Sequence, residues 1–270
     1  MKMNSKIFSK KIRLEVIKMA YEAKSSHIAS ALSIVDILSV LYNEFLIYDS
    51  NKTQFINRDR FILSKGHACS ALYAVLGLKN FFDKKLLSLY SKDDSDFMAH
   101  VSHKVPGVEF STGSLGHGLP FGTGIAHALK LKKIQSKVYV LIGDGELAEG
   151  SNFESLLFAA HNKLDNLVLI VDNNNLQSLT TVDKTLNLNP YDKKFESFNW
   201  EYFECDGNSI NSLQMTFKRI SKSKNKKPKV VVAKTIKGKG VSFMENKVEW
   251  HYKSPDIKQF DKAIKEVKDA

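Results

Sequence analysis

Residues 138–150 read VYVLIGDGELAEG, and residues 168–178 read VLIVDNNNLQS. Each stretch begins as an apolar run typical of a strand buried on both faces, and each ends in oxygen-bearing side chains. Residues 151–163, which lie between them, have the pattern of a helix, the usual connection between two parallel strands. We therefore expect the two strands to run parallel, with their carboxyl ends at the same edge of a sheet.

The alternation of strand and helix continues in both directions along the chain. The predicted strands are residues 61–63, 137–142, 167–172, 201–205 and 229–234, and the predicted helices are residues 6–23, 34–45, one that ends at 78, 119–132, 151–163, 192–198 and 210–221. Residues 91–118 form a long loop rich in His, Ser, Gly and Asp. No repeat or Pro-rich linker divides the chain, so we predict one α/β domain over residues 1–270. Its doubly wound, mostly parallel sheet should carry helices on both faces.

Asp144 and Asn174 follow the two buried strands, so both should face the crevice where doubly wound folds bind ligands. A carboxylate and an amide, with no Cys or His beside them, suit a hard cation such as Mg²⁺, which often completes its coordination with phosphate oxygens. Gly143 and Gly145 would let the backbone approach a diphosphate. A solvated turn between two core strands is the alternative, because turns favour the same residue types.

Two further features point to a polar ligand. Residues 111–124, STGSLGHGLPFGTG, hold glycines before a predicted helix, where amide groups can converge on an anion, although a flexible loop would have a similar composition. Histidines also recur in predicted loops, and their pKa near neutrality suits proton movement on a polyol. These histidines are His27, His67, His100, His103, His117 and His251.

The composition excludes several classes of protein. The net charge is +11, but the densest basic run, residues 218–229, has no aromatic residues for stacking on bases. We interpret that run as a solvated helix end and turn, and we expect no nucleic-acid partner. Cys69 and Cys205 lack CxxC spacing, which argues against a zinc site and against a disulfide framework. A reducing compartment fits these two cysteines best. Without a signal peptide or an apolar run of about 18 residues, we expect a cytoplasmic protein that does not bind membranes.

Five segments, in this order, resemble the N-terminal half of the transketolase family. They are SSHIAS with the following DIL, DRFILSKGHACSALYAVL, PGVEFSTGSLGHG, GDGELAEGSNFESLLFAAHNKLDNLVLIVDNNN, and AKTIKGKGVSFMENKVEWH. The GDG-to-Asn element is shared by most thiamine-diphosphate enzymes, whereas the second and third segments are particular to transketolases. Residues 25–30, SSHIAS, depart from the glycines that the family usually has there, and Asn173 and Asn175 replace the usual Asp and Gly.

The resemblance implies thiamine diphosphate and Mg²⁺ as cofactors, with Ca²⁺ or Mn²⁺ able to substitute, in a thiamine diphosphate-binding fold. Asp144, Asn174 and the carbonyl of Leu176 match the metal ligands. Cofactor contacts through the backbone match Gly113, Ser114, Leu115 and Gly145. The histidines that hold the diphosphate or the reacting hydroxyls match His27, His67, His100 and His251. Glu149 matches a glutamate near the subunit contact.

The resemblance also implies that part of the enzyme is on another chain. In the family, a pyrimidine domain supplies the glutamate that activates the cofactor, and this sequence stops after the diphosphate domain. We expect a C-terminal transketolase subunit as partner, in a dimer of heterodimers that moves a two-carbon ketol unit from a ketose, expected to be phosphorylated, to an aldose. The alternatives are the α subunit of a 2-oxo acid dehydrogenase-like enzyme and a non-catalytic paralogue.

Overall fold

The computed structural model describes residues 3–270, whose centre is a five-stranded sheet in the order β1-β2-β3-β5-β4. The strands are β1 (Arg60–Leu63), β2 (Val138–Gly143), β3 (Leu167–Asn173), β4 (Glu201–Asp206) and β5 (Lys229–Lys234). All four strand pairs are parallel. The predicted α/β class and parallel sheet are confirmed. Met1 and Lys2, which the predicted domain includes, lie outside the described residues.

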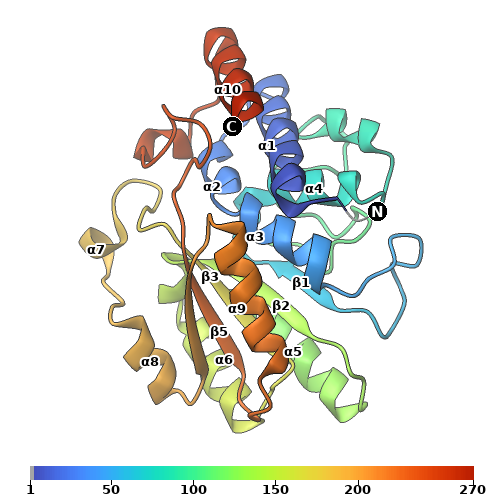
Figure 1. Ribbon diagram of the computed structural model, residues 1–270, viewed down its shortest axis with the longest axis vertical. Helices are drawn as coiled ribbons and strands as arrows, with labels where there is room; N and C mark the ends of the chain where they lie inside the picture. The colour runs from blue at the N-terminus through green and yellow to red at the C-terminus, as the bar shows by residue number, and fades with distance from the viewer. Residues whose placement is uncertain (1–2) are drawn as a thin grey trace.

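Helices cover both faces of the sheet, as predicted (Figure 1). The helices are α1 (Ser5–Glu22), α2 (Ile28–Ser33), α3 (Val35–Val40), α4 (Cys69–Leu78), α5 (Gly118–Leu131), α6 (Gly150–His161), α7 (Val182–Thr185), α8 (Tyr191–Ser197), α9 (Ile210–Lys222) and α10 (Ile257–Asp269). Successive strand side chains point to opposite faces. Tyr139 therefore joins a core with α1 to α4 and α9, whereas Val140 joins a core with α5, α6 and α8.

The structure departs from the predicted elements in three places. The helix predicted at 34–45 consists of α3 and a π-helical turn at Leu41–Phe45, and the short helix α2 before it was not predicted. The polar stretch after β3 contains the short helix α7. Helix α10 was not predicted, although Asp256 and Gln259 form a capping box at its start. It packs on α1, beyond the sheet (Figure 1).

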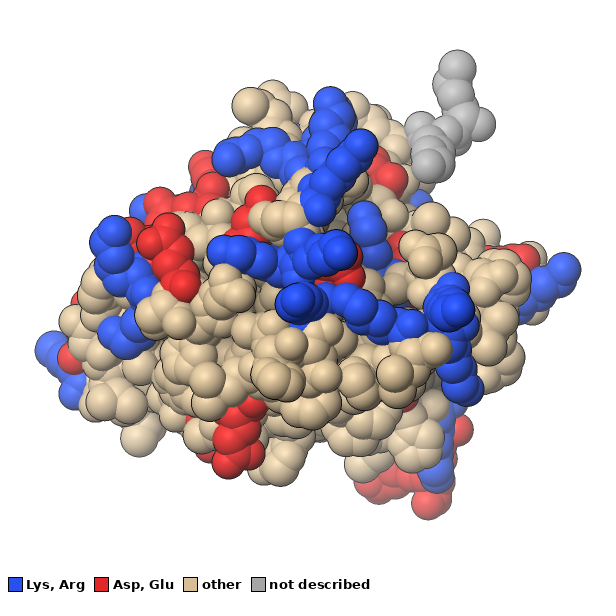
Figure 2. Space-filling view, turned by 90° about the horizontal axis from the view of Figure 1, so that it is seen from below, with Lys and Arg blue, Asp and Glu red and all other residues tan. Residues whose placement is uncertain are grey.

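The basic run at 218–229 is the end of α9 followed by a mostly exposed loop, and the last two residues of the run are buried. Lys229 is buried in β5, where its ammonium group donates to the carbonyls of Asp165 at 3.2 Å and Lys227 at 2.8 Å. That part of the interpretation is wrong, because β5 buries the last lysine and backbone carbonyl groups accept from its ammonium group. At the amino ends of the strands, basic side chains are spread over the surface with acidic ones among them (Figure 2).

No helix in residues 3–270 is both long enough and apolar enough to cross a membrane. Cys69 and Cys205 are buried free thiols.

Candidate functional site

A cavity of about 350 Å³ lies beyond the carboxyl ends of β2 and β3. It brings together residues that are far apart in the sequence. The predicted site residues that line it are His27, His67, His100, Gly113, Leu115, Asp144, Gly145, Glu149, Asn174, Leu176 and His251. Ser114 lies in the same glycine-rich loop but is exposed and does not line the cavity.

Asp144 and Asn174 emerge side by side, as the parallel strands predicted. Gly143 pairs with Asp172 across β2 and β3, which aligns the two strand ends. The carboxylate of Asp144 accepts backbone hydrogen bonds from Gly145 at 2.8 Å and Asn175 at 2.6 Å. Burial, followed by the charge of Asp172, raises the pKa of Asp144 to about 6. The carboxylate is therefore largely ionised at neutral pH.

The carbonyl of Leu176 faces positive charge inside the cavity. The ammonium group of Lys237 donates to this oxygen at 3.2 Å and to the carbonyl of Gln177 at 3.0 Å. Burial, followed by the charge of Lys65, lowers the pKa of Lys237 to about 8. Asp144, Asn174 and Leu176 thus present a carboxylate, an amide oxygen and a carbonyl, and this all-oxygen donor set fits a hard divalent cation.

Four histidines gather on the cavity wall. The ring of His27 lies 5.2 Å from that of His67, 5.8 Å from that of His100 and 4.9 Å from that of His251, measured between centroids. Burial is the main cause of the lowered pKa of all four, which is about 4 for His27 and about 3 for His251. The rings are neutral at pH 7, so each offers one N–H donor and one nitrogen acceptor.

The remaining loop histidines do not join this cluster. His103 hydrogen-bonds the hydroxyl of Ser111 at 2.7 Å, and both His103 and His117 are exposed. His27 is held in place by its backbone, which has φ of 69° and donates to the carbonyl of His251 at 2.8 Å. Such a left-handed conformation is uncommon for a side chain of this size.

A buried carboxylate organises the glycine-rich loop. Glu146 accepts from the backbone of Gly116 at 3.0 Å and of Gly143 at 3.1 Å, and it also accepts from the hydroxyl of Ser64. Gly116 has φ of +85°, and a Cβ there would lie 2.6 Å from that of Glu149. A Cβ on Gly118 would lie 2.4 Å from that of Ser64. The glycines therefore permit close packing against the strand ends.

Sequence reasoning missed four charged residues that shape the site, namely Lys65, Glu146, Asp172 and Lys237. Lys65 and Lys237 lie inside the transketolase-like segments, and each follows shortly after a buried strand. This position in the sequence could have identified both as residues of the site. Asp172 appeared to be only the end of a strand. Its side chain is fully buried and pairs with Lys65 at 2.5 Å.

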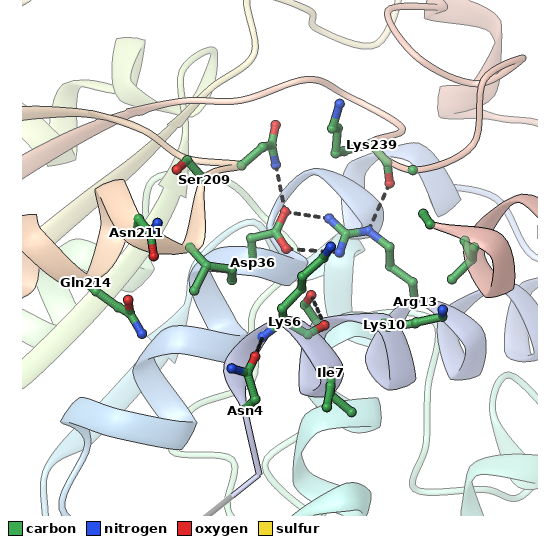
Figure 3. A pocket seen from close by; sticks show the side chains of 16 residues that line it. Asn4, Lys6, Ile7, Lys10, Arg13, Asp36, Ser209, Asn211, Gln214 and Lys239 are labelled. Carbon is green, nitrogen blue, oxygen red and sulfur yellow. Dashed lines mark hydrogen bonds and ion pairs between the residues drawn. The ribbon is translucent and has the colours of Figure 1, made fainter.

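A larger cavity of about 740 Å³ lies elsewhere, between α1, α9 and the segment after β5 (Figure 3). Its central carboxylate, Asp36, is bound by both terminal nitrogens of Arg13 at 3.0 and 2.5 Å. Asn208 donates to the same carboxylate at 3.2 Å. Because Asp36 is satisfied by these donors, we assign the chemistry to the smaller cavity, where ionisable groups converge.

Comparisons with known proteins give the family of the chain. The family profile "Transketolase, thiamine diphosphate binding domain" matches residues 4–266. The chain is 43% identical over 265 residues to a protein of Actinobacillus succinogenes that is named as one subunit of an apulose-4-phosphate transketolase, covering 97% of this chain and 95% of that protein. It is 38% identical over 259 residues to the protein of the same name from Phocaeicola vulgatus, covering 96% and 92%.

Among solved structures, transketolase from Campylobacter jejuni superposes with a TM-score of 0.93 at 30% sequence identity. The match covers 98% of this chain but 43% of that one. The chain therefore spans less than half the length of this solved relative, whereas it spans nearly all of the two apulose-4-phosphate transketolase subunits.

Proposed function

The chain belongs to the transketolase family, and on that premise we propose that it is the thiamine diphosphate-binding subunit of a split transketolase. The match to nearly the full length of two proteins that are themselves named as transketolase subunits supports this proposal. Two cores that share one sheet support a single domain. The active enzyme would then need a partner subunit that carries the pyrimidine domain, and we propose a dimer of heterodimers.

The proposal depends most on one observation, the placement of Asp144 and Asn174 opposite a cluster of histidines in one cavity. In this proposal Asp144, Asn174 and the carbonyl of Leu176 hold Mg²⁺, for which Ca²⁺ or Mn²⁺ can substitute. The backbone of Gly113, Ser114, Leu115 and Gly145 contacts the cofactor. Lys237 adds positive charge beside the diphosphate.

Thiamine diphosphate, when bound, supplies the nucleophilic carbon that carries the two-carbon ketol unit. The chain's own part is to hold the sugar and move its protons. His27, His67, His100 and His251 are neutral at pH 7 and line the cavity, so their ring nitrogens can donate to sugar hydroxyls or accept from them. His251 can only donate, because its Nδ1 lies 2.9 Å from the ammonium group of Lys237. Retention of this set together with Asp144 disfavours a non-catalytic paralogue.

Helices α5 and α6 carry exposed apolar side chains that could contact a partner subunit. Helices α5 and α6 pack side by side and expose Phe121, Leu157 and Phe158. Glu149 lines the cavity and immediately precedes α6, so the helix that carries Leu157 and Phe158 begins at the site. Exposed apolar surface of this kind marks protein interfaces, and we propose that the partner subunit docks here and completes the cofactor site.

For the substrate we propose a phosphorylated ketose donor and an aldose acceptor, because the names of both bacterial relatives specify a sugar phosphate. A 2-oxo acid substrate is disfavoured, since the chain matches the transketolase profile along its length.

The two free cysteines, Cys69 and Cys205, are compatible with a reducing location, and we propose the cytoplasm.

The test uses this chain purified alone and together with its partner subunit. Calorimetry should show thiamine diphosphate binding that requires Mg²⁺ in the complex, and the complex should consume a ketose phosphate but not pyruvate. The isolated chain should have no turnover. Activity of the rigorously pure single chain would refute the two-chain proposal, and absence of Mg²⁺-dependent binding in the complex would refute the cofactor site.

A further inference from the structure

Asp172 accepts four hydrogen bonds beneath the cofactor cavity. Its Oδ1 accepts from the hydroxyl of Ser33 at 2.7 Å and from that of Thr235. Its Oδ2 accepts from the ammonium group of Lys65 at 2.5 Å and from the side-chain amide of Asn174 at 3.0 Å. The carboxylate is fully buried. Two donors on each oxygen fill its acceptor sites and fix its orientation.

The four donors come from separate segments, and three of them lie two residues before a group that lines the cavity. Lys65 precedes His67, Asn174 precedes Leu176, and Thr235 precedes Lys237. Asp172 therefore connects the strand ends and loops from which the site is built. Among these connections, the one to Asn174 has a direct chemical consequence.

An ionised carboxylate accepts hydrogen bonds and cannot donate them, so it must face the NH₂ group of the Asn174 amide. The opposite end of the same amide accepts from the backbone N–H of Leu176 at 3.0 Å. If the amide turned over, its oxygen would face the Asp172 carboxylate and its NH₂ would face that N–H donor. Both contacts would be repulsive, so the amide has one favourable orientation.

We infer that Asp172 is a positioning residue that keeps the oxygen of Asn174, and not its NH₂ group, turned toward the divalent cation. The inference rests on the proposed function, because it concerns the same metal site. An NH₂ group cannot coordinate Mg²⁺, so loss of this orientation removes one of the three protein ligands. Residues that orient metal ligands in this way typically contribute about 10- to 100-fold in metal affinity.

The test separates orientation from charge by working in the Lys65→Met background, which removes the cation that Asp172 pairs with. Two variants are added to it, Asp172→Leu, which offers no acceptor, and Asp172→Asn, which offers an amide oxygen to Asn174. Mg²⁺ is titrated calorimetrically into each apo complex with its partner subunit, at saturating thiamine diphosphate. The Leu variant should bind Mg²⁺ about 10- to 100-fold more weakly than the background. The Asn variant should recover most of that loss.

Two controls make the result specific. Thr235→Val removes a donor to Oδ1 without touching the contact with Asn174, so it should lower the thermal midpoint but leave Mg²⁺ affinity near that of the wild type. Excess Mg²⁺ should restore thiamine diphosphate binding in the Leu variant, which a general folding defect would not allow. Equal losses in the Leu and Asn variants would overturn the inference, because charge would then explain the effect.

A second measurement needs no variant. In the wild-type complex, NMR should show that the side-chain NH₂ of Asn174 is protected from hydrogen exchange both before and after Mg²⁺ is added. Exchange as fast as that of a solvent-exposed amide would overturn the inference even if every substitution at Asp172 prevented folding. Wild-type protein without any Mg²⁺-dependent cofactor binding, but with a protected Asn174 amide, would count against the proposed function and not against the orientation.

Discussion

The ammonium nitrogen of Lys237 lies 2.9 Å from Nδ1 of His251. Because lysine can only donate, Nδ1 must accept, and the single proton of the neutral ring is on Nε2. Burial, followed by the charge of Lys237, lowers the pKa of His251 to about 3. A cation at this position therefore sets the tautomer of a histidine in the cavity and keeps its ring neutral at physiological pH.

The neutral histidines predict that acid destabilises the folded chain. A histidine in the unfolded chain binds its proton near pH 6.5, whereas the folded rings bind theirs at about 4 for His27 and about 3 for His251. Between pH 6.5 and pH 4 the unfolded state holds more protons, so the free energy of unfolding falls as the pH falls. The thermal midpoint should drop between pH 7 and pH 5.

His251→Gln should flatten this dependence, because glutamine still accepts from Lys237 but does not titrate. His103→Gln is the matched control, since His103 is exposed and outside the cluster. Calorimetric scans between pH 7.5 and pH 5 should show the His103→Gln protein following the wild type. A wild-type slope in the His251→Gln protein would mean that this ring is not responsible.

Replacing Glu146 with glutamine should destabilise the glycine-rich loop. The carboxylate of Glu146 accepts from Gly116, Gly143 and Ser64, whereas a glutamine would place an NH₂ group against at least one of these donors. An unsatisfied buried donor costs about 1–3 kcal/mol. Urea unfolding should show a loss of this size for Glu146→Gln and almost none for Glu154→Gln, because Glu154 is exposed on α6. Equal stability of the two variants would remove Glu146 from this role.

The strand ends could be predicted from the sequence, but most of the cavity wall could not. Asp144 and Asn174 follow continuous apolar runs joined by one helix, and this local pattern fixes the direction of both strands. The histidines come from separate loops, whose approach depends on tertiary contacts such as the hydrogen bond from the backbone of His27 to that of His251. Their clustering followed only from the family resemblance.

The buried charges were missed for a different reason. Lys65 and Asp172 neutralise each other, and nothing in their local sequence shows that the partner exists. Lys229 was assigned to a solvated run because the residues before it are mostly basic and polar, although β5 buries its side chain. Helix α10 has a recognisable capping box, but residues 233–251 before it were interpreted only through their resemblance to transketolases, and the residues after them were not assigned.

Removing only one partner of the Arg13–Asp36 ion pair should strongly destabilise the folded chain. Both side chains are nearly buried, with exposed fractions of 10% and 6% (Figure 3). Arg13→Met leaves the Asp36 charge uncompensated and should lower the free energy of unfolding by about 3–5 kcal/mol. The double variant Arg13→Met/Asp36→Leu should recover much of this loss, because an apolar pair has no charge to desolvate.

A urea double-mutant cycle measures this coupling. Mg²⁺-dependent cofactor binding in the folded double variant should match the wild type, since neither residue lines the cofactor cavity. Strictly additive losses in the two single variants would show that the pair contributes no coupling energy.

The apolar surface on α5 and α6 should determine assembly with the partner subunit. Leu157 and Phe158 are 59% and 47% exposed, so Leu157→Ser and Phe158→Ser should leave the thermal midpoint of the isolated chain nearly unchanged. Each should weaken the complex about tenfold, which corresponds to about 1.4 kcal/mol of lost apolar contact. Met215→Ser is the control, because Met215 is 66% exposed on α9, against the other face of the sheet. Sedimentation velocity across a concentration series would measure all three affinities, and equal affinities would place the partner on a different surface.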